Sequence, residues 1–178
     1  TKRVSVSGSM PSAHKARMTC AVLSALALAL SYMESFFPLT LMIPLPGVKL
    51  GLANIVTVYA LYALGEGEAL AILLVRCTLG ALFAGNASAL IFSLLGGLCA
   101  MLVMIGLHKL PKLSVYGVSV GGAAAHNIGQ VAAAVLTLGN SAPLAYLPFL
   151  LLVSLFTGAL TGLIASLLFR AMHAARFG

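Results

Sequence analysis

The sequence predicts an all-α membrane protein with six transmembrane helices. Hydrophobic residues make up 61% of its 178 residues, and charged residues make up only 7%. A chain of this composition, with a mean hydropathy of +1.11, lacks the polar surface that a soluble globule needs and therefore requires lipid. Its apolar residues fall into six runs. Within several runs small residues recur every four positions, a spacing that lets membrane helices pack closely.

The six apolar runs define the expected helices in chain order. They cover residues 19–37, 48–64, 69–84, 87–107, 115–138 and 144–172. Because a helix needs about 20 residues to cross the hydrocarbon, the second and third runs are short, whereas the last can tilt or emerge from the bilayer. We therefore expect a flexible cytoplasmic N-terminal tail over 1–18, a single six-helix domain over 19–172, and a cytoplasmic C-terminal tail over 173–178.

The distribution of basic residues predicts the orientation of these helices. In a six-span arrangement the connections 37–47, 85–86 and 139–143 share one side of the membrane and contain no Lys or Arg. The opposite side carries Lys2, Arg3, Lys15, Arg17, Lys109, Lys112, Arg170 and Arg176. By the positive-inside rule both termini are cytoplasmic, and we expect a multi-pass protein of the cell inner (plasma) membrane. The net charge of +7 is thus a topology signal and does not indicate nucleic-acid binding.

The acidic and cysteine residues limit the chemistry. The chain contains three Glu residues, at positions 34, 66 and 68, and no Asp. Paired carboxylates for acid–base or magnesium chemistry are therefore missing, and the three Cys residues lie in separate apolar runs without a zinc-ligand spacing. We predict that the protein is not an enzyme and that it has no metal site and no cofactor.

Polar side chains gather in the middle and outer parts of the predicted spans, where they are costly. An Arg near the bilayer centre costs several kcal/mol on insertion scales, so Arg76 must face protein, water or a partner. His126 and Gln130 are four residues apart and share one helical face. We predict that a substrate-binding pocket is formed by Glu34, Lys49, Asn54, Arg76, Asn86, His126, Asn127 and Gln130.

Each of these residues also has a structural interpretation. Arg76 can form an ion pair with Glu34, His126 can be an ordinary core residue, and Lys49 can extend its amine to the lipid headgroups. The proline-rich segment 37–47 is either a lid over the pocket or an apolar connector at the interface. If the polar residues converge, their basic groups outnumber the single acid, which favours an anionic or phosphorylated solute.

Three motifs resemble a known family. They are Lys49-Leu-Gly-Leu-Ala-Asn54, Arg76 with Gly80, and Ala125-His-Asn-Ile-Gly-Gln130. The chain resembles the Gx transporter family, also labelled heptaprenyl diphosphate synthase component I, and through it the substrate-binding S components of energy-coupling factor (ECF) transporters. The resemblance implies an S-component-like six-helix bundle that holds a solute near the outer surface, beneath the first outer loop.

The same resemblance implies partners. In S components, small residues of the first helix meet a membrane coupling subunit, and Ala21, Ala25 and Ala29 are the matching positions, which the four-residue spacing alone leaves open between docking and packing. The chain has no phosphate-binding loop motif for ATP, so an ATP-driven cycle needs separate ATPases. Membrane lipid and a small solute are the other expected partners, and nucleic acid is not expected.

Two functions follow as hypotheses. The first is a substrate-binding and transport subunit that captures a small solute from the outer face, such as a flavin, a vitamin or an isoprenoid-phosphate-like compound, with an anionic solute favoured. The second is a non-catalytic membrane accessory subunit of heptaprenyl diphosphate synthesis, beside a separate prenyl synthase subunit, or of a flavin-linked electron-transfer system. The synthase label itself conflicts with the absence of Asp, because aspartate-rich motifs hold the magnesium in prenyl diphosphate synthases. An intramembrane enzyme is the least favoured interpretation.

Overall fold

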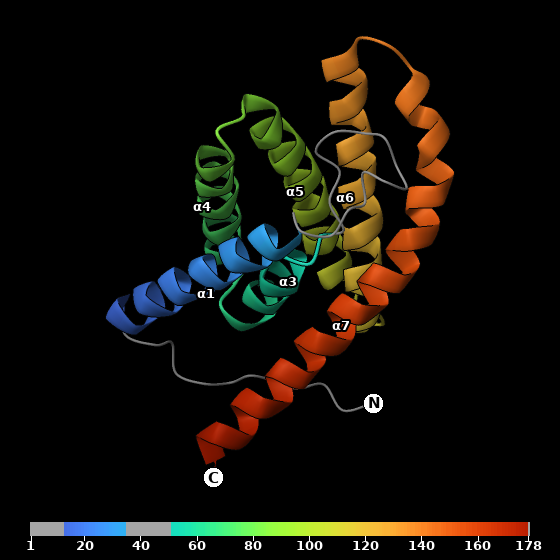
Figure 1. Ribbon diagram of the computed structural model, residues 1–178. Helices are drawn as coiled ribbons and strands as arrows, with labels where there is room; N and C mark the ends of the chain where they lie inside the picture. Colours follow the sequence, from blue (N-terminus) through green and yellow to red (C-terminus); the bar gives the residue numbers. More distant parts are fainter. Residues whose placement is uncertain (1–12, 35–50, 178) are drawn as a thin grey trace.

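The computed structural model describes residues 13–34 and 51–177, with side chains described from 17 to 34 and from 51 to 171. These residues form helices and turns and contain no strand (Figure 1). The elements are α1 (Ala13–Glu34), α3 (Asn54–Ala63), α4 (Glu66–Ala84), α5 (Ala87–His108), α6 (Val115–Leu138), the 3₁₀ turn η1 (Ala142–Tyr146) and α7 (Leu147–Phe177). The predicted all-α class is confirmed for this part of the chain.

Local signals set most helix boundaries. Gly85 and Gly139 end α4 and α6 in the left-handed conformation, with φ of 60° and 67°, which glycine adopts without a steric penalty. Asn86 and Ser114 cap the starts of α5 and α6, because their side chains accept hydrogen bonds from backbone N–H groups of the first turn. These boundaries agree closely with the predicted apolar runs.

The second apolar run differs from its prediction. The expected helix over 48–64 is wrong, because α3 begins only at Asn54 and has 10 residues, about 15 Å, roughly half of the hydrocarbon thickness. Gly51 has φ +83°, which interrupts a helix. Gly51 O and Leu52 O then accept hydrogen bonds from Asn54 N and Ile55 N, which start α3. Asn54 is therefore the first residue of a short helix rather than a residue inside a long one.

Within the part of the chain that the structure describes, three helical segments are long and apolar enough to cross a membrane. They are Glu66–Ala84, Ala87–His108 and Ala142–Ala171. Large apolar side chains point outward from them, and Leu82, Leu102 and Phe156 are each more than 70% exposed, as lipid-facing residues are. The chain is therefore a membrane protein, whereas the six-span count and the cytoplasmic termini stay predictions.

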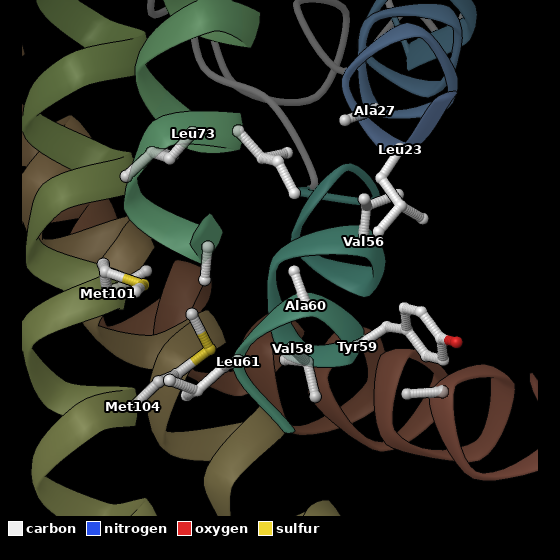
Figure 2. Close-up of a cluster of buried hydrophobic side chains, with 14 of the residues drawn as sticks. Leu23, Ala27, Val56, Val58, Tyr59, Ala60, Leu61, Leu73, Met101 and Met104 are labelled. Carbon is white, nitrogen blue, oxygen red and sulfur yellow. The ribbon is translucent and has the colours of Figure 1, made fainter. Parts of the chain in front are cut away.

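The short helix α3 lies at the centre of the bundle, in contact with α1, α4, α5, α6 and α7. The main apolar core surrounds it, and Figure 2 shows Val56 and Ala60 of α3 with Leu23 of α1, Leu73 of α4 and Met104 of α5. Because α3 reaches all of its neighbours, the turn that precedes it lies close to several helices at once.

Glycines bring α5, α6 and α7 together. A Cβ atom placed on Gly129 would lie 2.5 Å from Leu95 O of α5, and one placed on Gly158 would lie 2.5 Å from Val120 Cα of α6. Backbone therefore meets backbone at both contacts, as the four-residue spacing of small residues in several of the apolar runs allows. The 31 residues of α7 extend about 46 Å, which agrees with the prediction that the last helix exceeds the bilayer thickness; its C-terminal end projects beyond the other helices in Figure 1.

Candidate functional site

The structure buries six of the eight residues predicted to bind substrate and leaves one exposed. Lys49, together with the predicted lid over 37–47, lies outside the described residues. Asn86 is exposed, and the buried residues are Glu34, Asn54, Arg76, His126, Asn127 and Gln130.

Arg76 contacts α1 and α5 from its place in the middle of α4. Its side chain is 6% exposed, and its Nη1 donates a long hydrogen bond of 3.5 Å to Ser31 Oγ of α1. Nη2 lies against Gly97 of α5, 3.5 Å from the position that a Cβ atom would take there. Neither Nε nor Nη2 has a hydrogen-bond partner within the described part of the chain.

Glu34 is not the counter-ion of Arg76 in this structure. Its Oε1 accepts a 2.6 Å hydrogen bond from Leu52 N, in the turn before α3. Between described side chains the salt bridge is instead Lys109–Glu66, at 3.3 Å and exposed to solvent. The Arg76–Glu34 ion pair considered from the sequence is therefore not formed between these described side chains, and Oε1 of Glu34 instead links the end of α1 to the turn before α3.

The imidazole of His126 is packed between two glycines. A Cβ atom on Gly51 would lie 3.2 Å from His126 Cδ2, and one on Gly96 would lie 2.9 Å from His126 Cε1. The same positions would also crowd Asn54 Nδ2 and Gln130 Cγ, each at 3.0 Å. Any side chain at either glycine would thus displace the polar groups that meet there.

These contacts close into a circuit through five elements. From α4, Arg76 contacts Ser31 of α1, and Glu34 of α1 binds Leu52 in the turn before α3. In the same turn Gly51 contacts His126 of α6. His126 also contacts Gly96 of α5, and the next residue, Gly97, contacts Arg76. We call this group the polar ring, and all its side chains are more than nine-tenths buried: Ser31, Glu34, Asn54, Arg76, His126 and Gln130. The structure therefore brings together five of the predicted site residues.

Two predicted residues lie elsewhere. Asn127 faces α7, where its Nδ2 donates a 2.8 Å hydrogen bond to Leu150 O. Asn86 caps the start of α5 by accepting from Ser88 N at 2.8 Å, and the ten residues that separate it from Gly96 correspond to about 15 Å of helix. Both side chains thus have local structural roles outside the polar ring.

Ser31, Gly96 and Gly97 were missed by the sequence analysis. Ser31 lies one turn before Glu34 on α1 and thus on the same face. The adjacent Gly96 and Gly97 lie in the middle of α5, where each costs about 1 kcal/mol relative to Ala. A glycine pair that is retained at this cost was the available signal for a close approach of side chains.

The predicted docking residues Ala21, Ala25 and Ala29 are exposed on α1, on the opposite face from the buried Leu23 and Ala27.

An open apolar hollow of about 300 Å³ on the outer face of α4 is lined by Leu74, Val75, Thr78 and Leu79. It contains none of the polar ring residues and has the character of a lipid-facing surface. Within the described ranges no group of three or more His, Cys, Asp or Glu side chains could hold a metal ion.

The fold and the polar ring define a helical membrane protein with a polar cluster buried at the junction of its helices. A family model described as heptaprenyl diphosphate synthase component I matches residues 23–168, and the chain belongs to this family. No curated protein and no solved structure matches the chain. The family label anticipated from the sequence motifs is thus confirmed.

Proposed function

We propose that the protein is a membrane subunit that captures a small solute in the polar ring and passes it across the bilayer, as the S components of ECF transporters do. The observation that supports this most is the pair Arg76 and Asn54. Their side chains are 6% and 3% exposed, and Arg76 Nε and Nη2 and both amide atoms of Asn54 have no hydrogen-bond partner among the described residues.

Such groups are expensive in a membrane protein. A buried polar group without a partner costs about 1–3 kcal/mol, and more when it is charged. Intramembrane ionisable residues accordingly face one another, a water-filled space or a substrate. A solute that supplies the missing partners accounts for both residues at once.

The proposal includes the arrangement inferred from the sequence. Six spans with cytoplasmic termini put the solute site toward the outer face, and the exposed Ala21, Ala25 and Ala29 form the surface for a coupling subunit that works with separate ATPases. The protein itself is not an enzyme in this proposal, because a chain without Asp has no site for the magnesium of a prenyl diphosphate synthase.

The experiment is a search for a bound compound. The full chain is purified in detergent and studied by native mass spectrometry and thermal-shift screening against flavins, vitamins and isoprenoid phosphates. We expect one class of compound to bind the wild type and Asn86→Ala, whose exposed side chain only caps α5, and not to bind His126→Ala. Failure of every class, together with identical behaviour of His126→Ala, would rule the proposal out.

A second function is supported by the family description, which names a component of a synthase. In that case the chain is a non-catalytic membrane accessory of a separate prenyl synthase subunit, and the polar ring only holds the helices together. Co-purification of a synthase subunit with a chain that carries no bound compound would favour this second function over the first.

A further inference from the structure

The proposed function does not specify which chemical group of the solute the polar ring recognises. We infer that the ring binds an oxyanion, a carboxylate or phosphate group of the solute, on one edge of the Arg76 guanidinium. This inference rests on the proposed function, since it concerns the same site. It is carried by the geometry of Arg76 and the positions of the acids.

The free edge of Arg76 has the geometry that an oxyanion requires. Of its three nitrogens, Nη1 is used by Ser31, and the two without a described partner are Nε and Nη2. These two nitrogens form one side of the planar guanidinium, and their N–H bonds run parallel at the spacing of two carboxylate or phosphate oxygens. Ser31 thus orients the guanidinium and leaves a bidentate edge available.

No acidic side chain of the described residues forms a salt bridge with Arg76. The whole chain has only three acidic side chains. Glu66 is paired with the exposed Lys109 about 15 Å along α4 from Arg76, and Glu68 lies in the same first turn as Glu66. Glu34 binds Leu52 N and forms no salt bridge with Arg76 within the described chain. Because the segments outside the described residues contain no Asp or Glu, an anion brought by the solute is the counter-ion that fits.

Gly97 and Asn54 bear on how a solute would be held. Gly97 presents no side chain of its own beside Nη2, and the nearest atom to the position of its missing Cβ is Cδ1 of Leu73, at 2.6 Å, so a ligand that approaches Nη2 there has to displace only the end of this flexible side chain. Asn54 adds an amide donor and acceptor at the start of α3, next to Gly51 and His126. We assign Arg76 to the oxyanion and Asn54 to a neutral polar group of the same solute.

The test uses probes that differ in charge and not in shape. The full chain in detergent is titrated with benzoate, with its neutral analogue benzamide, and with inorganic phosphate, at constant ionic strength, and the melting temperature is recorded. We expect a saturable rise with benzoate, with phosphate, or with both, and none with benzamide. A response to benzoate alone identifies a carboxylate, and a response to phosphate alone identifies a phosphate group.

Three variants locate the response. Arg76→Met should abolish it without lowering the melting temperature of the unliganded protein, because an unbalanced buried charge is removed. Arg76→Lys should weaken anion binding about tenfold or more, since a point charge cannot replace a bidentate edge. Lys109→Gln is the matched control, because it removes an exposed cation and should leave the response unchanged.

The inference is overturned if benzamide matches benzoate, if neither anion gives a saturable rise, or if the response persists in Arg76→Met. A lower melting temperature of unliganded Arg76→Met also overturns it, because Arg76 would then be balanced within the protein. Retention of a neutral compound in native mass spectrometry without any anion response would end this inference and leave solute capture standing. If the protein shows neither an anion response nor a bound compound in native mass spectrometry, the proposed function is ruled out as well.

Discussion

The polar side chains on the two sides of α6 differ in how fully they are hydrogen-bonded. His126 and Asn127 are neighbours in sequence and point about 100° apart around the helix. On the side that faces α7, Asn127 donates to Leu150 O, and Ser154 and Thr161 of α7 donate to carbonyls of their own helix. On the side that faces the polar ring, Arg76 and Asn54 keep polar atoms without a described partner.

The contrast separates polar residues that stabilise packing from those available to a ligand. On the α7 side the exceptions within the described residues are the hydroxyls of Ser119 and Thr157, which are neutral and small. The ring side instead leaves part of a guanidinium and a whole amide without partners, at a much larger cost. Proteins keep such unfavourable groups where function requires them. The candidate site is therefore marked by polar atoms without a hydrogen-bond partner, and not by polarity as such.

The largest expected effect is on the α7 side, at Gly158. A methyl group there would lie 2.5 Å from Val120 Cα and 3.1 Å from Ser119 O, and backbone cannot move aside as a side chain can. We expect Gly158→Ala to destabilise the protein by about 1–3 kcal/mol, measured as a lower melting temperature in detergent.

Gly106 provides the control, because a Cβ atom placed on it meets nothing within 4 Å. Gly106→Ala should leave stability unchanged or raise it by up to about 1 kcal/mol, through helix propensity. Equal melting temperatures for the two variants would contradict the close α6–α7 contact.

Asn127 gives the next largest effect and tests the comparison directly. Asn127→Ala removes the 2.8 Å hydrogen bond to Leu150 O, and hydrogen bonds between membrane helices contribute about 0.5–2 kcal/mol. We expect a moderately lower melting temperature with solute or anion binding retained. Lost binding at unchanged stability would instead return Asn127 to the site, as the sequence had suggested.

The helices could be predicted from the sequence because their boundaries depend on local residues. The run 115–138 coincides with α6, between a Ser that caps its start and a Gly that ends it. The turn at Gly51 could not be predicted in this way. Its glycine is needed because His126 and Asn54 press against it, and His126 comes from a helix more than 70 positions away in the chain.

The sequence predicted the types of residue that form the candidate site better than it predicted which individual residues belong to it. Arg76 and Glu34 are conspicuous because charge is costly in lipid, and the spacing of His126 and Gln130 puts them on one face. No local signal distinguishes Asn127, because its partner is a backbone carbonyl of α7. Asn86 could have been excluded from the candidate site on sequence alone, since an Asn directly before a helix is a common N-cap.

A smaller effect on stability is expected at Asn54, where the loss should fall on binding instead. Asn54→Leu removes an amide whose atoms have no described partner, so the melting temperature should stay equal or rise. Solute binding should weaken, because one polar contact is lost. A fall in stability as large as that of Asn127→Ala would mean that the two asparagines do not differ in kind.

The smallest effect is expected at Lys109, whose salt bridge to Glu66 is 3.3 Å long and lies at a surface where the side chains are 64% and 48% exposed. Exposed ion pairs contribute about 0–1 kcal/mol and are screened by salt, so Lys109→Gln should shift the melting temperature only slightly, and less in high salt. Glu66 stays solvated after the change, which is why nothing large is lost. Arg76 lies in the middle of α4, the helix that begins at Glu66, is only 6% exposed, and forms no salt bridge with a described side chain. The free energy of unfolding lost in Lys109→Gln can be compared with the free energy of anion binding lost in Arg76→Met. If the first were larger than the second, solvent exposure would not be what distinguishes the two cations, and the assignment of Arg76 to a ligand would lose its physical basis.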